Sequence, residues 1–260
     1  MNLYTRHIGD PRRPAILMLH GLFGDNTDWD FLIDFLKNNF YIIAVDLPGH
    51  GSSSIQTHTT FKEAIDNLHQ ELNLSKHQPS IIGYSMGGRI AMGLKCQYPG
   101  SYHHLIIESA HFGLVSEQEK LNRLENDLKL LNNYTELNTF FKYWYGQKIF
   151  GELSKHQKYP QVLIKRLNNN IENLKIAINN FSLGKQNFFA EQLNMFNQDI
   201  CYIVGGNDQK YAAYGNGLAN KFNHLQLKII SDASHMAHFE GPSIFAEIVN
   251  QFLSKNILDL

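Results

Sequence analysis

The sequence predicts an α/β fold with a mostly parallel central sheet, helices on both faces and a helical lid insertion. Short apolar runs alternate with segments of helical periodicity, the pattern of a parallel sheet wrapped by helices. Each run ends in a loop of Gly, Pro, Ser or His, and a long middle segment shows helical periodicity alone. The 260 residues, 43% of them hydrophobic, suffice for one core, so we expect a single domain over residues 1–260.

Strands are expected over residues 15–19, 41–45, 80–84, 105–107, 200–204 and 227–230. The first four are apolar on both faces, as central parallel strands are. Apolar residues recur at helical spacing between them, which predicts helices over residues 29–36, 61–72 and 86–98. A final helix is expected over residues 243–252.

The lid is expected over roughly residues 115–195, a stretch rich in Asn, Lys, Glu and Leu. Ser116 followed by Glu119 resembles a capping box, with Ser116 as the N-cap and Glu119 reaching back to its backbone. We expect these helices to cover the carboxyl-terminal edge of the sheet.

Composition excludes several classes of protein. The net charge of −1 argues against a nucleic-acid binder, which needs a basic face. Cys96 and Cys201 have no metal-site spacing and are expected to be free thiols. No apolar run is long enough to cross a bilayer and no secretory signal is visible, so we expect a cytoplasmic protein. The sequence does not indicate an oligomeric state.

Gly83-Tyr84-Ser85-Met86-Gly87 matches G-x-S-x-G, with an apolar strand before it and a helix pattern after it. In that context the motif predicts a sharp turn that exposes the Ser85 hydroxyl, rather than an ordinary turn with a capping serine. The Met86 backbone N–H then lies at a helix N-terminus, where negative charge is stabilised. Leu22, just after the pair His20-Gly21, is expected to supply a second oxyanion donor.

A serine hydroxyl needs a base, and the base needs an orienting acid. In α/β hydrolases these follow in the order Ser, acid, His. Asp208 and His235 each follow a predicted strand in that order, so we expect a Ser85, Asp208, His235 triad. Of the other candidates, Asp232 is expected to be a solvated turn residue, His238 to pack or cap the last helix, and Asp46 to support a loop.

Three arginines are candidates for the pocket. Arg89 lies one helical turn after Ser85, and Arg123 and Arg166 stand in the predicted lid. Arginine suits bidentate recognition of carboxylates, but residue spacing alone favours a solvated charge for each lid arginine. Spacing alone also favours a core position for Trp144 and Tyr145.

The whole chain resembles the 2-succinyl-6-hydroxy-2,4-cyclohexadiene-1-carboxylate (SHCHC) synthase family of bacterial menaquinone biosynthesis, within the α/β hydrolases. The elbow and the segment Val45-Asp46-Leu47-Pro48-Gly49-His50-Gly51-Ser52 are general to α/β hydrolases. The more specific motifs are Glu108-Ser109-Ala110-His111-Phe112-Gly113-Leu114, Trp144-Tyr145 and Arg166-Leu167-Asn168-Asn169-Asn170.

This resemblance implies a lyase that eliminates pyruvate from 2-succinyl-5-enolpyruvyl-6-hydroxy-3-cyclohexene-1-carboxylate without a metal or other cofactor. Ser85, activated by His235 and Asp208, would abstract a ring proton. The substrate carries several carboxylates, which the arginines would bind. The resemblance thus implies substrate-binding side chains at Tyr84, Arg89, Arg123, Trp144 and Arg166.

The sequence departs from the family pattern at two points. Gly205-Gly206-Asn207-Asp208 stands where Gly-Glu-x-Asp is commoner, and Ser234 replaces the usual Gly before the catalytic His. Neither change removes a reacting group. Two alternatives stay open: a carboxylesterase or thioesterase acting through an acyl-serine, and a binding module that retains the fold.

Overall fold

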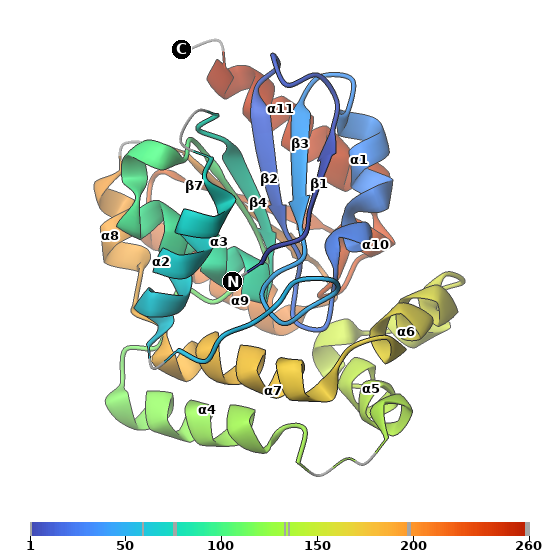
Figure 1. The fold of residues 1–260 in the computed structure, drawn as a ribbon. Helices are drawn as coiled ribbons and strands as arrows, with labels where there is room; N and C mark the ends of the chain where they lie inside the picture. The colour runs from blue at the N-terminus through green and yellow to red at the C-terminus, as the bar shows by residue number, and fades with distance from the viewer. Residues whose placement is uncertain are drawn as a thin grey trace.

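Seven strands form one sheet in the order β1-β3-β2-β4-β5-β6-β7 (Figure 1). The computed structural model describes residues 2–58, 60–74, 77–132, 134, 136–196 and 199–257. The strands are β1 (Thr5–Ile8), β2 (Ala15–Leu19), β3 (Tyr41–Val45), β4 (Ser80–Tyr84), β5 (Leu105–Glu108), β6 (Ile200–Gly205) and β7 (Leu225–Ile230). Every neighbouring pair is parallel except β1 with β3. The predicted mostly parallel sheet is confirmed.

Both faces of the sheet are covered, which explains why the central strands are apolar throughout. Leu17 and Leu19 of β2 belong to one core cluster, and Ile16 and Met18 belong to the other. This alternation follows from the period of two along a strand. Helices α2 (Phe61–Leu72), α3 (Met86–Gln97) and α9 (Gln209–Lys221) contribute to the first cluster, and α1 (Asp30–Leu36) and α11 (Pro242–Ile257) to the second.

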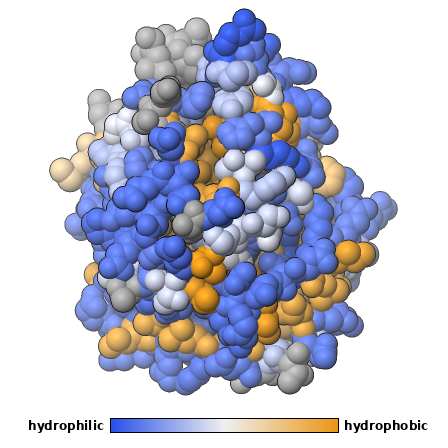
Figure 2. Space-filling model, in the orientation of Figure 1, coloured by the Kyte–Doolittle hydropathy of each residue, from blue (hydrophilic) through white to orange (hydrophobic). Residues whose placement is uncertain are grey.

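The chain between β5 and β6 forms the helices α4 (Glu117–Lys129), α5 (Leu137–Tyr145), α6 (Tyr159–Leu167), α7 (Ile171–Asn180) and α8 (Ala190–Met195). We call residues 116–195 the helical insertion; α4 to α7 gather at one end of the molecule (Figure 1). Ser116 Oγ accepts from Glu119 N at 3.4 Å, which confirms Ser116 as the N-cap of α4. Leu121 and Leu128 of α4 are exposed, and apolar patches lie over this end of the molecule (Figure 2).

The edge strand β1 and helix α9 are among the elements that were not predicted. The edge strand β1 is half-exposed and has no apolar run. Helix α9 contains Gly215, a poor helix former, because a Cβ there would approach Leu227 and Tyr202 to 2.9 Å. The final helix is longer than predicted, and Thr60 and Glu63 form a capping box at α2.

Cys96 and Cys201 are free, as predicted. Among the described residues, no helix is long and apolar enough to span a membrane.

Candidate active site

Ser85 lies on the tight turn between β4 and α3, with a left-handed backbone (φ 50°). The glycines of the motif make this turn possible. A Cβ on Gly87 would lie 2.0 Å from the Leu19 carbonyl oxygen, and one on Gly83 would lie 2.5 Å from the Gly87 oxygen. Only glycine permits this approach of helix to strand, and a non-glycine residue at φ > 0 is strained in a way typical of functional sites.

Ser85, His235 and Asp208 form one connected series, as predicted. His235 Nδ1 lies 2.6 Å from Asp208 Oδ2, and His235 Nε2 lies 3.2 Å from Ser85 Oγ. Asp208 is fully buried and His235 is 3% exposed. With its Nδ1–H donating to the carboxylate, the imidazole presents Nε2 as the acceptor for the Ser85 hydroxyl. The geometry fits transfer of a proton from Ser85 to His235.

The turns after β6 and β7 hold the acid and the base. Asp208 is the N-cap of α9, and its Oδ1 accepts from Tyr211 N while its Oδ2 faces His235. His235 N donates to the Ile149 carbonyl oxygen at 3.0 Å, so a residue of the helical insertion orients the base. The rings of Tyr84, Phe150 and Tyr211 surround the imidazole at centroid distances of 4.9–5.5 Å.

The two predicted oxyanion donors lie beside Ser85. Met86 is the first residue of α3, so its N–H has no acceptor within the helix. Leu22 lines the cavity that contains Ser85. The chain passes close to Tyr84 here, since a Cβ on Gly21 would lie 2.5 Å from that ring. His20 fixes the loop by accepting from Leu47 N at 2.9 Å.

The cavity at Ser85 has a volume of only about 20 Å³. Its walls are Leu22, Tyr84, Ser85, Trp144, Tyr145, Phe150, Arg166 and His235. The strand ends thus supply one side and the helical insertion the other. Ligand pockets commonly measure about 300–1,000 Å³, so this cavity is smaller than a typical ligand pocket.

Arg166 reaches this cavity but is already engaged in an ion pair that the sequence analysis missed. Its Nη1 and Nη2 donate to the two oxygens of Asp28 at 2.9 and 2.8 Å, and its Nε donates to Tyr145 Oη. Both charged side chains are less than a tenth exposed. Burial alone would lower the pKa of Arg166, but Asp28 and Tyr145 raise it above its usual range. Two guanidinium hydrogens remain for a ligand.

Arg89 and Arg123 lie outside the lining of the small cavity but close to each other. Arg89 Nη1 donates to Gln186 Oε1 at 3.2 Å, and Arg123 Nε donates to Asp127 Oδ1 at 2.8 Å. Burial, together with the charge of Arg123, lowers the pKa of Arg89 to about 10. Burial, Lys210 and these two arginines also lower the pKa of His111, to about 4. The positive charges of Arg89, Arg123 and Lys210 thus lie around His111, and Arg89 follows Ser85 by one helical turn.

Trp144 lines the cavity and also packs on Phe23 at 5.2 Å. The packing expected from spacing and the pocket position implied by the resemblance both hold for this residue.

Asp232 is exposed, as predicted. His238 packs in the core and bonds Glu108 through Nδ1, and Asp46 supports its loop by accepting from Asn26 and Ser52. These outcomes confirm the three assignments.

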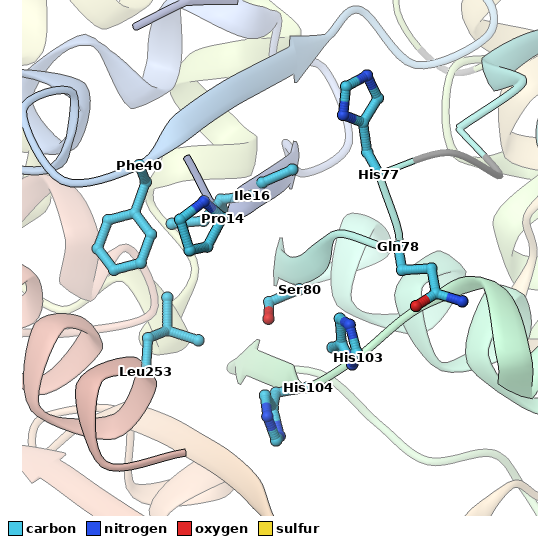
Figure 3. Close-up of a pocket in the computed structure, with 10 residues that line it drawn as sticks. Pro14, Ile16, Phe40, His77, Gln78, Ser80, His103, His104 and Leu253 are labelled. Atoms are coloured by element: carbon cyan, nitrogen blue, oxygen red, sulfur yellow. The ribbon is translucent and has the colours of Figure 1, made fainter. Parts of the chain in front are cut away.

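A larger cavity of about 230 Å³ lies at the amino-terminal ends of β2, β4 and β5 (Figure 3). Ser80, His103 and His104 line it together with apolar side chains. It contains none of the predicted site residues and lies at the edge of the sheet opposite Ser85.

Neutral buried histidines support the loops around the site and make stability depend on pH. His50 is 1% exposed, and burial followed by the nearby His20 lowers its pKa to about 3. Since the unfolded state has the ordinary pKa of 6.5, unfolding takes up a proton below that pH. The neutral form of His50 therefore makes its full contribution to the free energy of unfolding above pH 6.5. This contribution is lost as the pH falls from 6.5 towards 3.

The free energy of unfolding should fall on acidification in this window, with His50 contributing a slope of about 1.4 kcal/mol per pH unit. Urea titrations at a series of pH values measure it. His50→Gln should reduce the slope by about that amount, whereas His77→Gln, at an exposed position, should not. An unchanged slope in His50→Gln would contradict the assignment.

Comparison with known proteins agrees with this geometry. The α/β-hydrolase-fold family model matches residues 14–242. A 2-succinyl-6-hydroxy-2,4-cyclohexadiene-1-carboxylate synthase from Pectobacterium atrosepticum is 31% identical over 257 residues, covering 96% of this chain and 97% of its own. A second such synthase, from an Enterobacter species, is also 31% identical, over 97% of this chain and 96% of its own.

Among solved structures, MenH from S. aureus matches with a TM-score of 0.88 at 22% identity, over 98% of each chain. At this identity the likeness shows the fold alone. The two synthases, in contrast, match nearly the full length of this chain at 31% identity. The chain belongs to the α/β-hydrolase-fold family and, within it, to the 2-succinyl-6-hydroxy-2,4-cyclohexadiene-1-carboxylate synthases, which are carbon–oxygen lyases.

Proposed function

We propose that this chain eliminates pyruvate from 2-succinyl-5-enolpyruvyl-6-hydroxy-3-cyclohexene-1-carboxylate to give SHCHC, with Ser85 as general base. The observation that carries the proposal is a connected Ser85–His235–Asp208 series with Arg166 in the wall of its cavity. Arg89, one helical turn after Ser85, lies close to Arg123. The series supplies a base, and the arginines suit a substrate with several carboxylates.

The bond changes follow from the structures of substrate and product. The proton at ring carbon 2 is acidic because that carbon carries the succinyl ketone. As Ser85 removes it and passes its own proton to His235, a double bond forms between carbons 2 and 3. The existing double bond moves to carbons 4 and 5, and the bond from carbon 5 to the enolpyruvyl oxygen breaks. His235 returns the proton to enolpyruvate, which tautomerises to pyruvate.

The backbone N–H groups of Leu22 and Met86 would stabilise the ketone oxygen while charge from ring carbon 2 delocalises into it. Their position beside Ser85 supports this role. Preorganised donors of this kind lower the barrier wherever negative charge develops. The proposed reaction uses only groups of the chain and its polycarboxylate substrate.

The helical insertion would act as a lid. The cavity of about 20 Å³ cannot hold the substrate, so residues 137–150, which carry Trp144 and Phe150, would move outward to admit it while Arg166 stays bonded to Asp28. Opening would place the cationic group of Arg89 and Arg123 and the remaining N–H donors of Arg166 around one enlarged pocket. Closure would then exclude water from the charged intermediate.

Arg89→Ala should raise KM for the enolpyruvyl substrate by about tenfold or more, since a charge-assisted hydrogen bond contributes about 1.5–3 kcal/mol. Steady-state kinetics measure the change. Arg13→Ala, which removes an exposed arginine, is the matched control and should leave KM unchanged. An unchanged KM in Arg89→Ala would contradict the proposed carboxylate site.

The function itself is tested by giving the purified protein two substrates, the enolpyruvyl compound and a neutral activated aryl ester. We expect pyruvate release from the first well above the spontaneous rate and little turnover of the second. The fold alone does not decide this, because a thermophilic esterase from Thermogutta terrifontis matches with a TM-score of 0.80 at 20% identity, over 97% of this chain and 93% of its own. Fast ester hydrolysis without pyruvate release would favour the acyl-serine alternative.

A further inference from the structure

Ser234, the residue immediately before His235, is 1% exposed and joined to two other segments. Its backbone N–H donates to Glu240 Oε2 at 2.7 Å. Its Oγ lies 2.5 Å from the same carboxyl oxygen and 2.9 Å from the Phe150 carbonyl oxygen. Serine at this position departs from the family pattern, and glycine would form neither side-chain contact.

The two partners come from different parts of the fold. Phe150 ends the short helix η3 (Lys148–Phe150) of the helical insertion, and Glu240 ends α10 (Ala237–Glu240). His235 forms a second bond to the same part of the insertion, because its N–H donates to the Ile149 carbonyl oxygen. Two consecutive residues of the His235 loop are therefore bonded to two consecutive residues of the insertion.

The hydroxyl of Ser234 has one hydrogen but lies within bonding distance of two acceptors. When Glu240 is ionised, the hydroxyl hydrogen serves either the carboxylate or Phe150. When Glu240 is protonated, it donates to Ser234 Oγ, and Ser234 donates to Phe150, so both contacts are hydrogen bonds. Burial raises the pKa of Glu240, opposed by the Ser234 hydrogen bonds and His156 and assisted by Glu108.

We propose that Ser234 and Glu240 are positioning residues that fix the His235 loop to η3 and bring His235 to Ser85 when the helical insertion is closed. The proposal rests on the proposed function for its kinetic consequence, but the tether itself does not depend on the substrate. Outward movement of η3 would break the bonds to Ile149 and Phe150 together. The base would then be aligned in the closed form and released in the open one.

Three variants test the tether against Ser231→Ala, a matched control at an exposed position of the same loop. Ser234→Ala removes the hydroxyl, and Glu240→Ala removes its partner. Glu240→Gln keeps a neutral partner whose amide oxygen, in the place of Oε2, accepts from Ser234 N while the Ser234 hydroxyl donates to Phe150. We expect kcat for pyruvate release to fall about tenfold or more in both alanine variants, with KM within about twofold. Misplacement of a reacting group by about 1 Å has effects of this size. Glu240→Gln should retain kcat within about twofold.

Two readouts are independent of the lyase reaction. One is the proton NMR signal of His235 Nδ1–H, and the other is the relative rate at which a fluorophosphonate labels Ser85. Both should match wild type in Ser231→Ala and Glu240→Gln, whereas Ser234→Ala should broaden the signal and slow labelling.

If Ser234→Ala matched Ser231→Ala in the NMR signal and labelling, or if Glu240→Gln lost as much as Glu240→Ala, the proposal would be overturned. Should Ser234→Ala fail to fold, the two Glu240 variants decide alone. If wild type released no pyruvate, the proposed function would fail, while the NMR and labelling results would still decide the tether.

Discussion

Replacing Ser85 by alanine is expected to lower kcat for pyruvate release by about 10³-fold or more. The variant keeps the substrate pocket but has no hydroxyl to receive the ring proton and pass one to His235. Groups that act as a unit lose most of their effect when one is removed. Release of pyruvate can be followed by coupling it to lactate dehydrogenase and NADH.

Ser109→Ala is the matched control for this substitution. Ser109 is buried and, like Ser85, has a positive φ (48°), and its hydroxyl has no hydrogen-bond partner within the described part of the chain. Both substitutions therefore place alanine at a position with positive φ. A Ser85→Ala enzyme within about tenfold of wild type would show that another group takes the proton.

Asp28→Asn is expected to reduce the free energy of unfolding by about 3–5 kcal/mol. It leaves the charge of Arg166 buried without its partner, and breaking one side of a buried pair has a cost in this range. Because Arg166 also lines the Ser85 cavity, activity should fall with stability. Urea unfolding followed by fluorescence measures the first effect.

An exposed pair supplies the control for Asp28→Asn. Glu152 pairs with Lys155, and both side chains are about three-quarters exposed, so Glu152→Gln should change stability by less than about 1 kcal/mol. The double variant Asp28→Asn with Arg166→Met should recover part of the loss, since no unpaired buried charge remains. If Asp28→Asn and Glu152→Gln had the same free energy of unfolding, the buried pair of Asp28 and Arg166 would not be a source of stability.

The sequence predicted the central strands and the Ser85, Asp208, His235 series because both are encoded locally. A strand buried on two faces reads as an apolar run, and Ser85, Asp208 and His235 each lie in a turn that follows a predicted strand. The edge strand Thr5–Ile8 is half-exposed and therefore has no apolar run. The glycines of α9 lower helix propensity, and the contact that requires Gly215 comes from Tyr202 and Leu227.

Interactions between distant segments could not be predicted in this way. Asp28 precedes Arg166 by 138 residues, and nothing near either residue indicates the other. Spacing alone favoured a solvated Arg166, whereas the structure buries it. The contact of Ser234 with Phe150 is of the same kind, since Ser234 looks like a small substitution for Gly until the insertion folds against it. The closed cavity likewise depends on how α5 and α6 pack over the strand ends.

A substrate deuterated at ring carbon 2 tests whether this chain eliminates pyruvate with Ser85 as base. Pyruvate and SHCHC should form in equal amounts, well above the spontaneous rate, and deuterium should slow the first turnover. Intact-protein mass spectrometry during turnover should show no adduct on Ser85. Release of pyruvate no faster than without the protein, or an acyl group accumulating on Ser85, would contradict the claim.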